Sequence, residues 1–415
     1  MDVQKIEGKR LAWLLTLLYC ASYITRINYS ASLQAIITAT GFPKSELAVI
    51  AVCMSITYGL GQIINGWIGD RIKPQNLLFC GLLLSSLINL VFPFSELLPV
   101  GAVIPTMAML WAVNGFAQAM MWPPIVKILV ATMDDATYSY SVVRISWGSS
   151  FGTILVYLVA PLIISLSSWK AVFFACAAFG LAVAVLWGLL KSRVDCSESN
   201  PHGVAEKMVP QTLRFPRAAL LPSLLIAFAI VMMGMLRDGV TNWMPTYLAE
   251  VFRFDDTMSI LCTVSLAIFS IVSFSASAWL YRRFFANEVL CAAIIFAIAL
   301  VSAGGMYLFF GVGAAVAVLC MALITGCMHG INLMLITHVP KRFKRFGNVS
   351  TVSGVINSFT YVGAAISTYG IAVLSEAIGW RNTVGVWAII ALIGMGACLL
   401  AAGAWKKQMI HREEK

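Results

Sequence analysis

Runs of about 20 apolar residues recur along the whole chain, and no other feature constrains the fold so strongly. A helix of that length crosses the hydrocarbon core of a bilayer. The chain has 415 residues, of which 60% are hydrophobic and only 11% are charged, whereas soluble domains carry about 25% charged residues. We therefore predict an all-α, multi-pass membrane protein with twelve transmembrane helices, which cover residues 11–38, 46–69, 76–93, 99–126, 139–165, 169–190, 218–248, 258–280, 288–310, 312–338, 348–375 and 382–405.

The distribution of positive charge predicts how these helices are oriented. The net charge is +10, and most of the 28 lysines and arginines fall at the N-terminus, in alternate loops and at the C-terminus. Four lie on the opposite side: Lys44, Lys170, Arg253 and Arg381. This positive-inside bias predicts cytoplasmic termini and a place in the cytoplasmic (inner) membrane, and it argues against nucleic acid as a partner. Cysteines and histidines show no ligand-like spacing, so we expect no metal and no cofactor.

A single offset relates the two halves of the chain. The longest polar stretch, residues 191–217, is predicted to be a cytoplasmic linker between an N-terminal bundle (1–190) and a C-terminal bundle (218–415). Adding 211 to Arg26 gives Arg237, and adding 211 to Trp169 gives Trp380. Parallel six-helix repeats are a transporter architecture with the binding site near the midplane, between the repeats. We predict two pseudo-symmetric six-helix bundles.

Few charges remain inside the predicted helices: Arg26, Arg144, Arg237 and Asp238. An arginine at the bilayer centre costs at least about 2.5–3.5 kcal/mol, so it is expected to face a cavity or a partner. The guanidinium fork matches phosphate or carboxylate in bidentate geometry. Asp238 is the one nearby carboxylate and could pair with one of these arginines, although adjacent helical residues point apart, but one acid cannot neutralise two or three arginines. We therefore predict that Arg26 and Arg237 clamp one external anion, while Arg144 either contacts the substrate or snorkels to the interface.

The scarcity of carboxylates inside the membrane also suggests how transport is coupled. Proton-driven carriers usually bury a titratable acid, and here the membrane offers only Asp238. An empty arginine clamp would leave uncompensated charge, which should slow the return of the empty carrier and favour exchange of anions. No Ser-His-Asp set, metal cluster or pair of carboxylates lies at a plausible depth in the predicted helices, and the phosphate-cradling G-x-x-x-x-G-K-[ST] loop is absent from the sequence. We therefore expect neither an enzyme nor an ATP-driven pump.

Two groups of motifs resemble a known family. "NGWIGDRIKPQN" resembles the G-x-x-x-D-R motif between helices two and three of the major facilitator superfamily, which implies that Gly66, Asp70 and Arg71 hold the two halves together on the cytoplasmic side. "GFAQAMMWPP", "LRDGVTNWMPTYL", "YITRINYS" and "TVSGVINSFTYVGA" are similar to helices four, seven, one and eleven of the organophosphate:phosphate antiporters, the group of the bacterial glycerol-3-phosphate and hexose-6-phosphate carriers.

The resemblance implies a set of substrate-binding residues. Arg26 and Arg237 correspond to the phosphate-binding arginines of that group, and Tyr23, Tyr58 and Tyr361 would line the cavity. Trp122 is expected to pack beside the two prolines that follow it. The chain departs from the glycerol-phosphate carriers at four positions, because Ile27 and Gln62 replace lysines, Trp147 replaces a histidine and Arg144 replaces an asparagine. The full set of expected substrate contacts is Arg26, Arg237, Tyr23, Tyr58, Gln62, Arg144, Trp147, His329 and Tyr361.

Three functions stay open from the sequence. The leading one is a monomeric secondary carrier that exchanges a sugar or glycerol phosphate for inorganic phosphate by alternating access. "YGLGQIINGWIGDR" also resembles the anion:cation symporters of the same fold, which carry sugar acids and other carboxylates with protons and often have glutamine at the position of Gln62. The third is a sugar-phosphate membrane sensor, which would bind its ligand but transport little of it.

Overall fold

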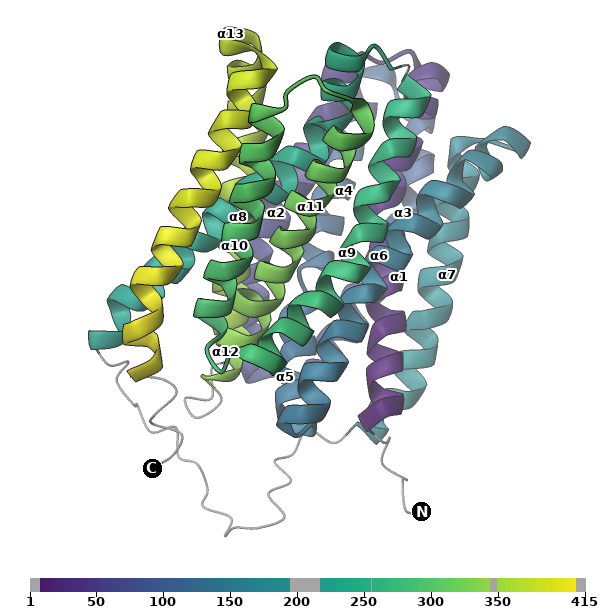
Figure 1. Cartoon of the computed structure of the whole chain (residues 1–415). Coiled ribbons are helices and arrows are strands. Elements are labelled where there is room, and N and C mark those ends of the chain that lie inside the picture. Colours follow the sequence, from purple (N-terminus) through teal and green to yellow (C-terminus); the bar gives the residue numbers. More distant parts are fainter. Residues whose placement is uncertain (1–7, 195–216, 255, 344–348, 408–415) are drawn as a thin grey trace. The chain divides into compact units, whose positions relative to one another are not determined.

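The protein is helical over nearly all the residues that the structure describes. The computed structural model describes residues 8–194, 217–254, 256–343 and 349–407 (Figure 1). Its α-helices are α1 (Gly8–Thr40), α2 (Lys44–Arg71), α3 (Pro74–Val91), α4 (Val100–Gln118), α5 (Trp122–Thr132), α6 (Asp135–Leu166), α7 (Trp169–Leu190), α8 (Arg217–Phe252), α9 (Asp256–Phe284), α10 (Glu288–Leu308), α11 (Ala314–Asn332), α12 (Val339–Lys341) and α13 (Val349–Trp405). Short 3₁₀ segments are η1 (Phe92–Leu97) and η2 (Lys191–Arg193), and η3 (Leu333–His338) is π-helical.

The prediction of an all-α, multi-pass membrane fold is confirmed. Among the described residues, eleven helical stretches are long and apolar enough to cross a membrane. The remaining predicted span is α1, which is long enough at 33 residues but carries polar side chains such as Arg26 and Asn28 in its middle. The helix that carries Arg26 is thus the least apolar of the long helices.

The structure places two helix boundaries differently from the sequence-based spans. The predicted span 99–126 is broken, because α4 ends at Gln118 and α5 begins at Trp122. Pro123 and Pro124 follow immediately, and the first turn of a helix is where proline fits best, because its missing N–H has no partner there in any case. Conversely, α13 runs through both of the last two spans. Its axis breaks at Gly379, whose φ of 74° is a conformation that glycine adopts without steric cost.

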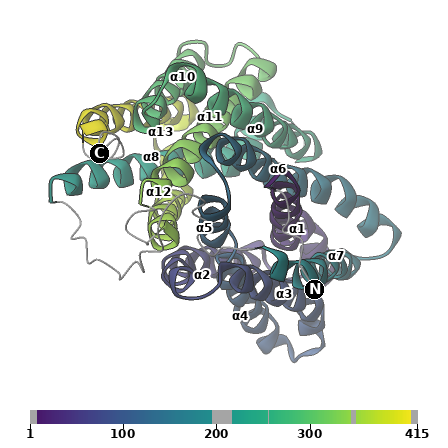
Figure 2. The ribbon, with the colours of Figure 1, turned by 90° about the horizontal axis from the view of Figure 1, so that it is seen from below.

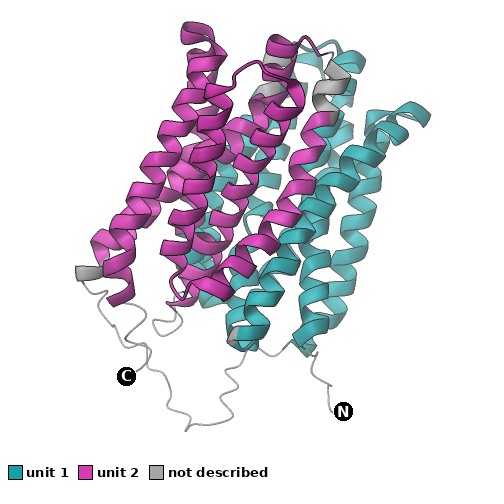
Figure 3. Ribbon diagram, in the orientation of Figure 1, with its two compact units in different colours: residues 1–207, 348–355 teal, residues 208–347, 356–415 magenta. Residues whose placement is uncertain are grey.

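Contacts divide the chain into two compact units, which Figure 3 colours separately. Unit 1 contains residues 1–207 and 348–355, and unit 2 contains residues 208–347 and 356–415. Unit 1 therefore includes the first turns of α13. Most of the predicted linker, residues 195–216, lies outside the described residues. The predicted bundle boundaries at 190 and 218 stay a prediction.

Unit 1 is built on α1, which packs along α6 and α7, while α2 packs on α4 and α3 on α7 (Figures 1 and 2). One end of this unit is filled by an aromatic core. Phe92 stacks on Phe173 with ring centroids 4.8 Å apart, and Tyr29 packs on Trp111 at 5.3 Å. The buried Tyr29 hydroxyl donates a hydrogen bond to the carbonyl oxygen of Leu47 at 2.8 Å. This core lies one turn beyond Arg26 on α1 and fixes that end of the helix.

Unit 2 is centred on α11, which contacts α8, α9 and α10. The first turn of α10 carries a fully buried carboxylate, Glu288. Arg342 donates to both of its oxygens, at 3.2 and 3.3 Å, and the Trp405 indole N–H donates to Oε1 at 3.0 Å. A buried charge needs such partners to be tolerated, so this cluster joins α10, the segment after α12 and the end of α13.

The tryptophans related by the 211-residue offset occupy matching places within their own units. Trp169 is the first residue of α7, and Trp380 follows the break at Gly379. Both side chains are buried, and each packs edge-on against an aromatic ring, Phe173 at 5.6 Å and Tyr247 at 5.4 Å. The two contacts are not equivalent, because Phe173 lies on the same helix as Trp169 whereas Tyr247 lies on α8, so the repeat stays a prediction from the sequence.

Candidate anion-binding site

Arg26 lies near the middle of α1, between two tyrosine rings. It stands 18 residues after the start of the helix and 14 before its end, or about 27 and 21 Å at 1.5 Å per residue. Its guanidinium carbon lies 4.4 Å from the ring centroid of Tyr58 on α2 and 5.5 Å from that of Tyr23. A desolvated cation over an aromatic face gains up to about 2 kcal/mol. Three predicted site residues, Arg26, Tyr23 and Tyr58, are thus brought together in unit 1.

A buried network of uncharged polar side chains holds α1 at the depth of Arg26. The carbonyl oxygen of Thr25 accepts hydrogen bonds from Asn89 on α3 at 2.9 Å and from Asn114 on α4 at 3.1 Å. Ser85 and Gln118 complete the network, with Gln118 donating to Thr25 Oγ1 at 3.0 Å and to Ser85 Oγ at 2.8 Å. None of these residues was predicted from the sequence. Asn114 and Gln118 could have indicated a polar network, because they stand at i and i+4 in an apolar helix and so share one face.

Gln62 and the G-x-x-x-D-R motif pack against the start of α13, within unit 1. Gln62 is fully buried, and a Cβ on Gly354 would lie 2.0 Å from its carbonyl oxygen, so the two backbones are in close contact. The Asp70 carboxylate accepts the backbone N–H groups of Ser350 at 3.0 Å and Thr351 at 2.7 Å. A carboxylate at this position satisfies two of the otherwise unpaired N–H groups of a helix start.

Arg144 and Trp147 lie on α6, where the Arg144 guanidinium contacts aromatic rings. The guanidinium carbon of Arg144 is 4.9 Å from the ring of Trp13 and 4.0 Å from the ring of Tyr140, to whose hydroxyl it also donates a hydrogen bond. Trp13 precedes Arg26 by 13 residues on α1, which corresponds to about 20 Å along the helix. Whether Arg144 contacts the substrate stays a prediction. The buried indole N–H of Trp147 has no hydrogen-bond partner among the described residues.

In unit 2, Arg237 forms an ion pair with its neighbour Asp238, the internal pairing that the sequence left open beside an external anion. Arg237 Nε lies 2.7 Å from Asp238 Oδ1, and Nη2 lies 3.1 Å from Oδ2. The expectation that adjacent helical residues point apart holds for Cβ directions. It failed here because the long arginine side chain can fold back along the helix. Arg237 is therefore already bound bidentately by a residue of the chain.

The other predicted residues of unit 2 lie on α11 and α13. His329 on α11 is partly buried, its ring centroid lies 5.3 Å from that of Phe274, and both Arg237 and Asp238 act on it electrostatically. Tyr361 lies on α13, which packs closely on α8. A Cβ on Gly234 would lie 2.2 Å from the carbonyl oxygen of Thr360. Tyr361 and Arg237 are thus about one helical turn apart in depth.

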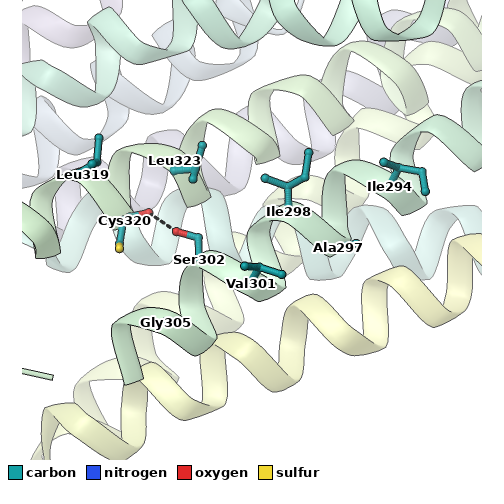
Figure 4. A pocket seen from close by; sticks show the side chains of 9 residues that line it. All are labelled: Ile294, Ala297, Ile298, Val301, Ser302, Gly305, Leu319, Cys320 and Leu323. Atoms are coloured by element: carbon teal, nitrogen blue, oxygen red, sulfur yellow. Dashed lines mark hydrogen bonds between the residues drawn. The ribbon is translucent and has the colours of Figure 1, made fainter. Parts of the chain in front are cut away.

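An apolar groove on unit 2 does not have the chemistry of an anion site. It has a volume of about 450 Å³ and lies between α10 and α11 (Figure 4). Ile298, Val301 and Leu323 are typical of its lining, and Ser302 donates its hydroxyl hydrogen to the carbonyl oxygen of Cys320 at 3.1 Å. No charged side chain lines this groove. The arginines are therefore the candidates for binding an anion.

A polytopic helical chain with arginines midway along two of its helices has the features of a secondary membrane carrier. Residues 15–368 match the family model described as "Major Facilitator Superfamily". The chain belongs to this superfamily. It is an integral, multi-pass membrane transporter rather than an enzyme.

The chain is distantly similar to several named membrane proteins over most of its length. It is 25% identical to the glycerol-3-phosphate transporter of Bacillus subtilis, with 92% of this chain and 88% of that protein aligned. It is 22% identical to a probable hexose phosphate transport protein of Chlamydia muridarum (91% and 87%) and 21% identical to the membrane sensor protein UhpC of Escherichia coli (96% and 94%). The fold is similar to that of the fucose:proton symporter of E. coli, with a TM-score of 0.73 at 14% identity over 95% and 99% of the two chains.

Proposed function

We propose that the protein exchanges an organophosphate, a sugar or glycerol phosphate, for inorganic phosphate by alternating access. Arg26 carries the proposal, because its guanidinium sits midway along a transmembrane helix between two tyrosine rings and a buried network braces the backbone beside it. Holding a cation at this depth is costly unless it serves a partner. Relatives named for hexose phosphate and glycerol-3-phosphate transport support a phosphorylated substrate.

In this proposal each arginine binds phosphoryl oxygens through its planar fork, which matches phosphate geometry better than the point charge of a lysine does. Tyr23 and Tyr58 offer hydroxyl groups next to Arg26, and Tyr361 and His329 offer polar groups near Arg237. That both arginines bind the same anion stays a prediction from the sequence. So do the roles of Gln62, Trp147 and the Gly66, Asp70 and Arg71 motif, the monomeric state, and the cytoplasmic membrane with both termini in the cytoplasm.

A counterflow panel tests the proposal. Proteoliposomes loaded with phosphate are offered radiolabelled glycerol phosphates, hexose phosphates, triose phosphates or sugar acids, and uptake is compared with that of vesicles that contain no phosphate. We expect uptake of at least one phosphate monoester that depends on internal phosphate. Uptake of sugar acids alone, without any phosphorylated compound, would contradict the proposal.

A second candidate function is proton-coupled uptake of an organic anion, and one observation favours it. Asp238 is a carboxylate in the middle of α8, and intramembrane acids often carry the coupling proton. In this case an imposed proton gradient would drive uptake into vesicles that contain no counter-anion. Saturable ligand binding without either kind of flux would instead favour a sensor, as the similarity to UhpC suggests.

A further inference from the structure

The Arg237–Asp238 pair has the geometry of an occupied anion site. Nε and Nη2 lie on one edge of the guanidinium, and each donates to a different oxygen of the Asp238 carboxylate, at 2.7 and 3.1 Å. This is the fork-to-fork arrangement with which arginine binds two oxygens of a phosphate. The two side chains are 15% and 25% exposed, so the pair is largely withdrawn from solvent but accessible to a ligand.

We propose that Asp238 is a resident counter-anion that occupies the Arg237 fork in the empty carrier and yields it to the phosphoryl group of the substrate. This inference rests on the proposed function, because it names the group that the substrate must displace. The carboxylate supplies two oxygens and one negative charge, whereas a phosphoryl group supplies three oxygens and up to two negative charges. Both compete for the same two N–H groups.

The surroundings of the pair suit such an exchange. The Arg237 backbone is fixed, because its carbonyl oxygen accepts a hydrogen bond from Thr241 Oγ1 at 2.6 Å. The displaced carboxylate needs only a rotation of a short side chain. Arg237 and Asp238 are both only partly exposed, at 15% and 25%, so the released carboxylate stays close to the guanidinium that it leaves. Arginine cannot give up its proton, so its charge is neutralised either by Asp238 or by the ligand.

Two consequences follow for transport. First, Arg237 binds its ligand more weakly than an arginine without a bound carboxylate would, because every ligand must displace Asp238. Second, the empty carrier does not expose an uncompensated Arg237 charge, whose burial would be unfavourable. The empty form can therefore change conformation, and the protein should show measurable net efflux beside exchange. Removing the Asp238 charge should tighten binding and make exchange stricter.

A double-mutant cycle on phosphate binding tests this role. Inorganic phosphate is titrated calorimetrically into purified full-length protein in detergent, using the wild type, Asp238→Asn, Arg237→Gln and the double variant, each checked for a monodisperse elution profile. We expect Asp238→Asn to lower the Kd for phosphate about tenfold, and to have no effect when Arg237 is absent. Asp238→Glu keeps the charge and should recover part of the wild-type Kd relative to Asp238→Asn. An unchanged or raised Kd in Asp238→Asn would overturn the inference.

A flux measurement separates this inference from the proposed function. In phosphate-loaded proteoliposomes, the ratio of net efflux to phosphate self-exchange should fall severalfold in Asp238→Asn. A wild type that binds and exchanges phosphate while this ratio is unaffected would refute the role of Asp238 and leave the proposed function intact. A wild type that binds neither phosphate nor a sugar phosphate would refute both.

Discussion

The buried network beside Arg26 leads to a prediction for two adjacent serines. Ser85 and Ser86 are neighbours on α3, and both are buried. The Ser85 hydroxyl bonds other helices, through Thr25 at 2.9 Å, Asn114 at 2.7 Å and Gln118 at 2.8 Å. The Ser86 hydroxyl donates only to the carbonyl oxygen of Leu82, within its own helix, at 2.7 Å. The substitution Ser→Ala therefore removes interhelical hydrogen bonds at one position and none at the other.

The expected loss in the free energy of unfolding follows from how many hydrogen bonds one hydroxyl makes at the same time. Ser85 donates one hydrogen, to either Thr25 or Asn114, and accepts one from Gln118, so Ser85→Ala removes two simultaneous interhelical bonds. At an average of about 0.6 kcal/mol each in membrane proteins, the loss is about 1.2 kcal/mol. Ser86→Ala should cost less than about 0.5 kcal/mol, since its loss is local to one helix.

The assay is the free energy of unfolding in bicelles by steric trapping, with the two variants measured in parallel. Because the network braces the backbone next to Arg26, we also expect Ser85→Ala, but not Ser86→Ala, to raise the KM for phosphate. Equal free energies of unfolding for the two variants would show that the network contributes nothing beyond ordinary burial.

Three further predictions concern other parts of the chain. Gly354→Ala should lower the free energy of unfolding by about 1–3 kcal/mol and reduce uptake, because the new Cβ would lie 2.0 Å from the Gln62 carbonyl oxygen. In the control Gly370→Ala the new Cβ meets nothing within 4 Å, so melting and uptake should match the wild type. Asp70→Ala should lower the free energy of unfolding by about 0.5–2 kcal/mol, the usual cost of losing such a helix cap, and retention of full stability would argue against the capping role. Arg144→Gln should reduce the rate of phosphate self-exchange no more than severalfold, because its contact on α1, Trp13, is about 20 Å from Arg26 along the helix. Abolition of exchange would place Arg144 in the binding site itself.

Much of the fold could be predicted from hydropathy because a bilayer leaves few options. Backbone groups in the hydrocarbon region must be satisfied within the segment, so apolar runs of this length become helices. The positions of Arg26 and Arg237 could be recognised because each charge stands alone in such a run. The predicted spans end at 375 and resume at 382, on either side of the break at Gly379. The end of α4 at Gln118, inside the predicted span 99–126, was not predicted, because it depends on local backbone geometry that an average over 20 residues conceals.

The contacts of the candidate site were harder to predict, for two reasons. The Arg237–Asp238 pair contradicts the helical-face rule, which describes where side chains start and not how far an arginine reaches. The distance between Arg144 and Arg26 depends on the register of α6 against α1, which is set by Gly148 packing on Thr16. A single sequence carries no direct signal for that register, so residues on different helices could not be ranked by depth.

The account depends on Arg26 and Arg237 binding phosphate, and phosphate self-exchange in proteoliposomes tests this most directly. We expect Arg26→Gln and Arg237→Gln each to reduce the initial rate of self-exchange by at least two orders of magnitude, with normal insertion into the vesicles. Arg253→Gln, just beyond the end of α8, serves as the matched control and should exchange like the wild type. Near-normal exchange in either of the two variants would contradict the central claim.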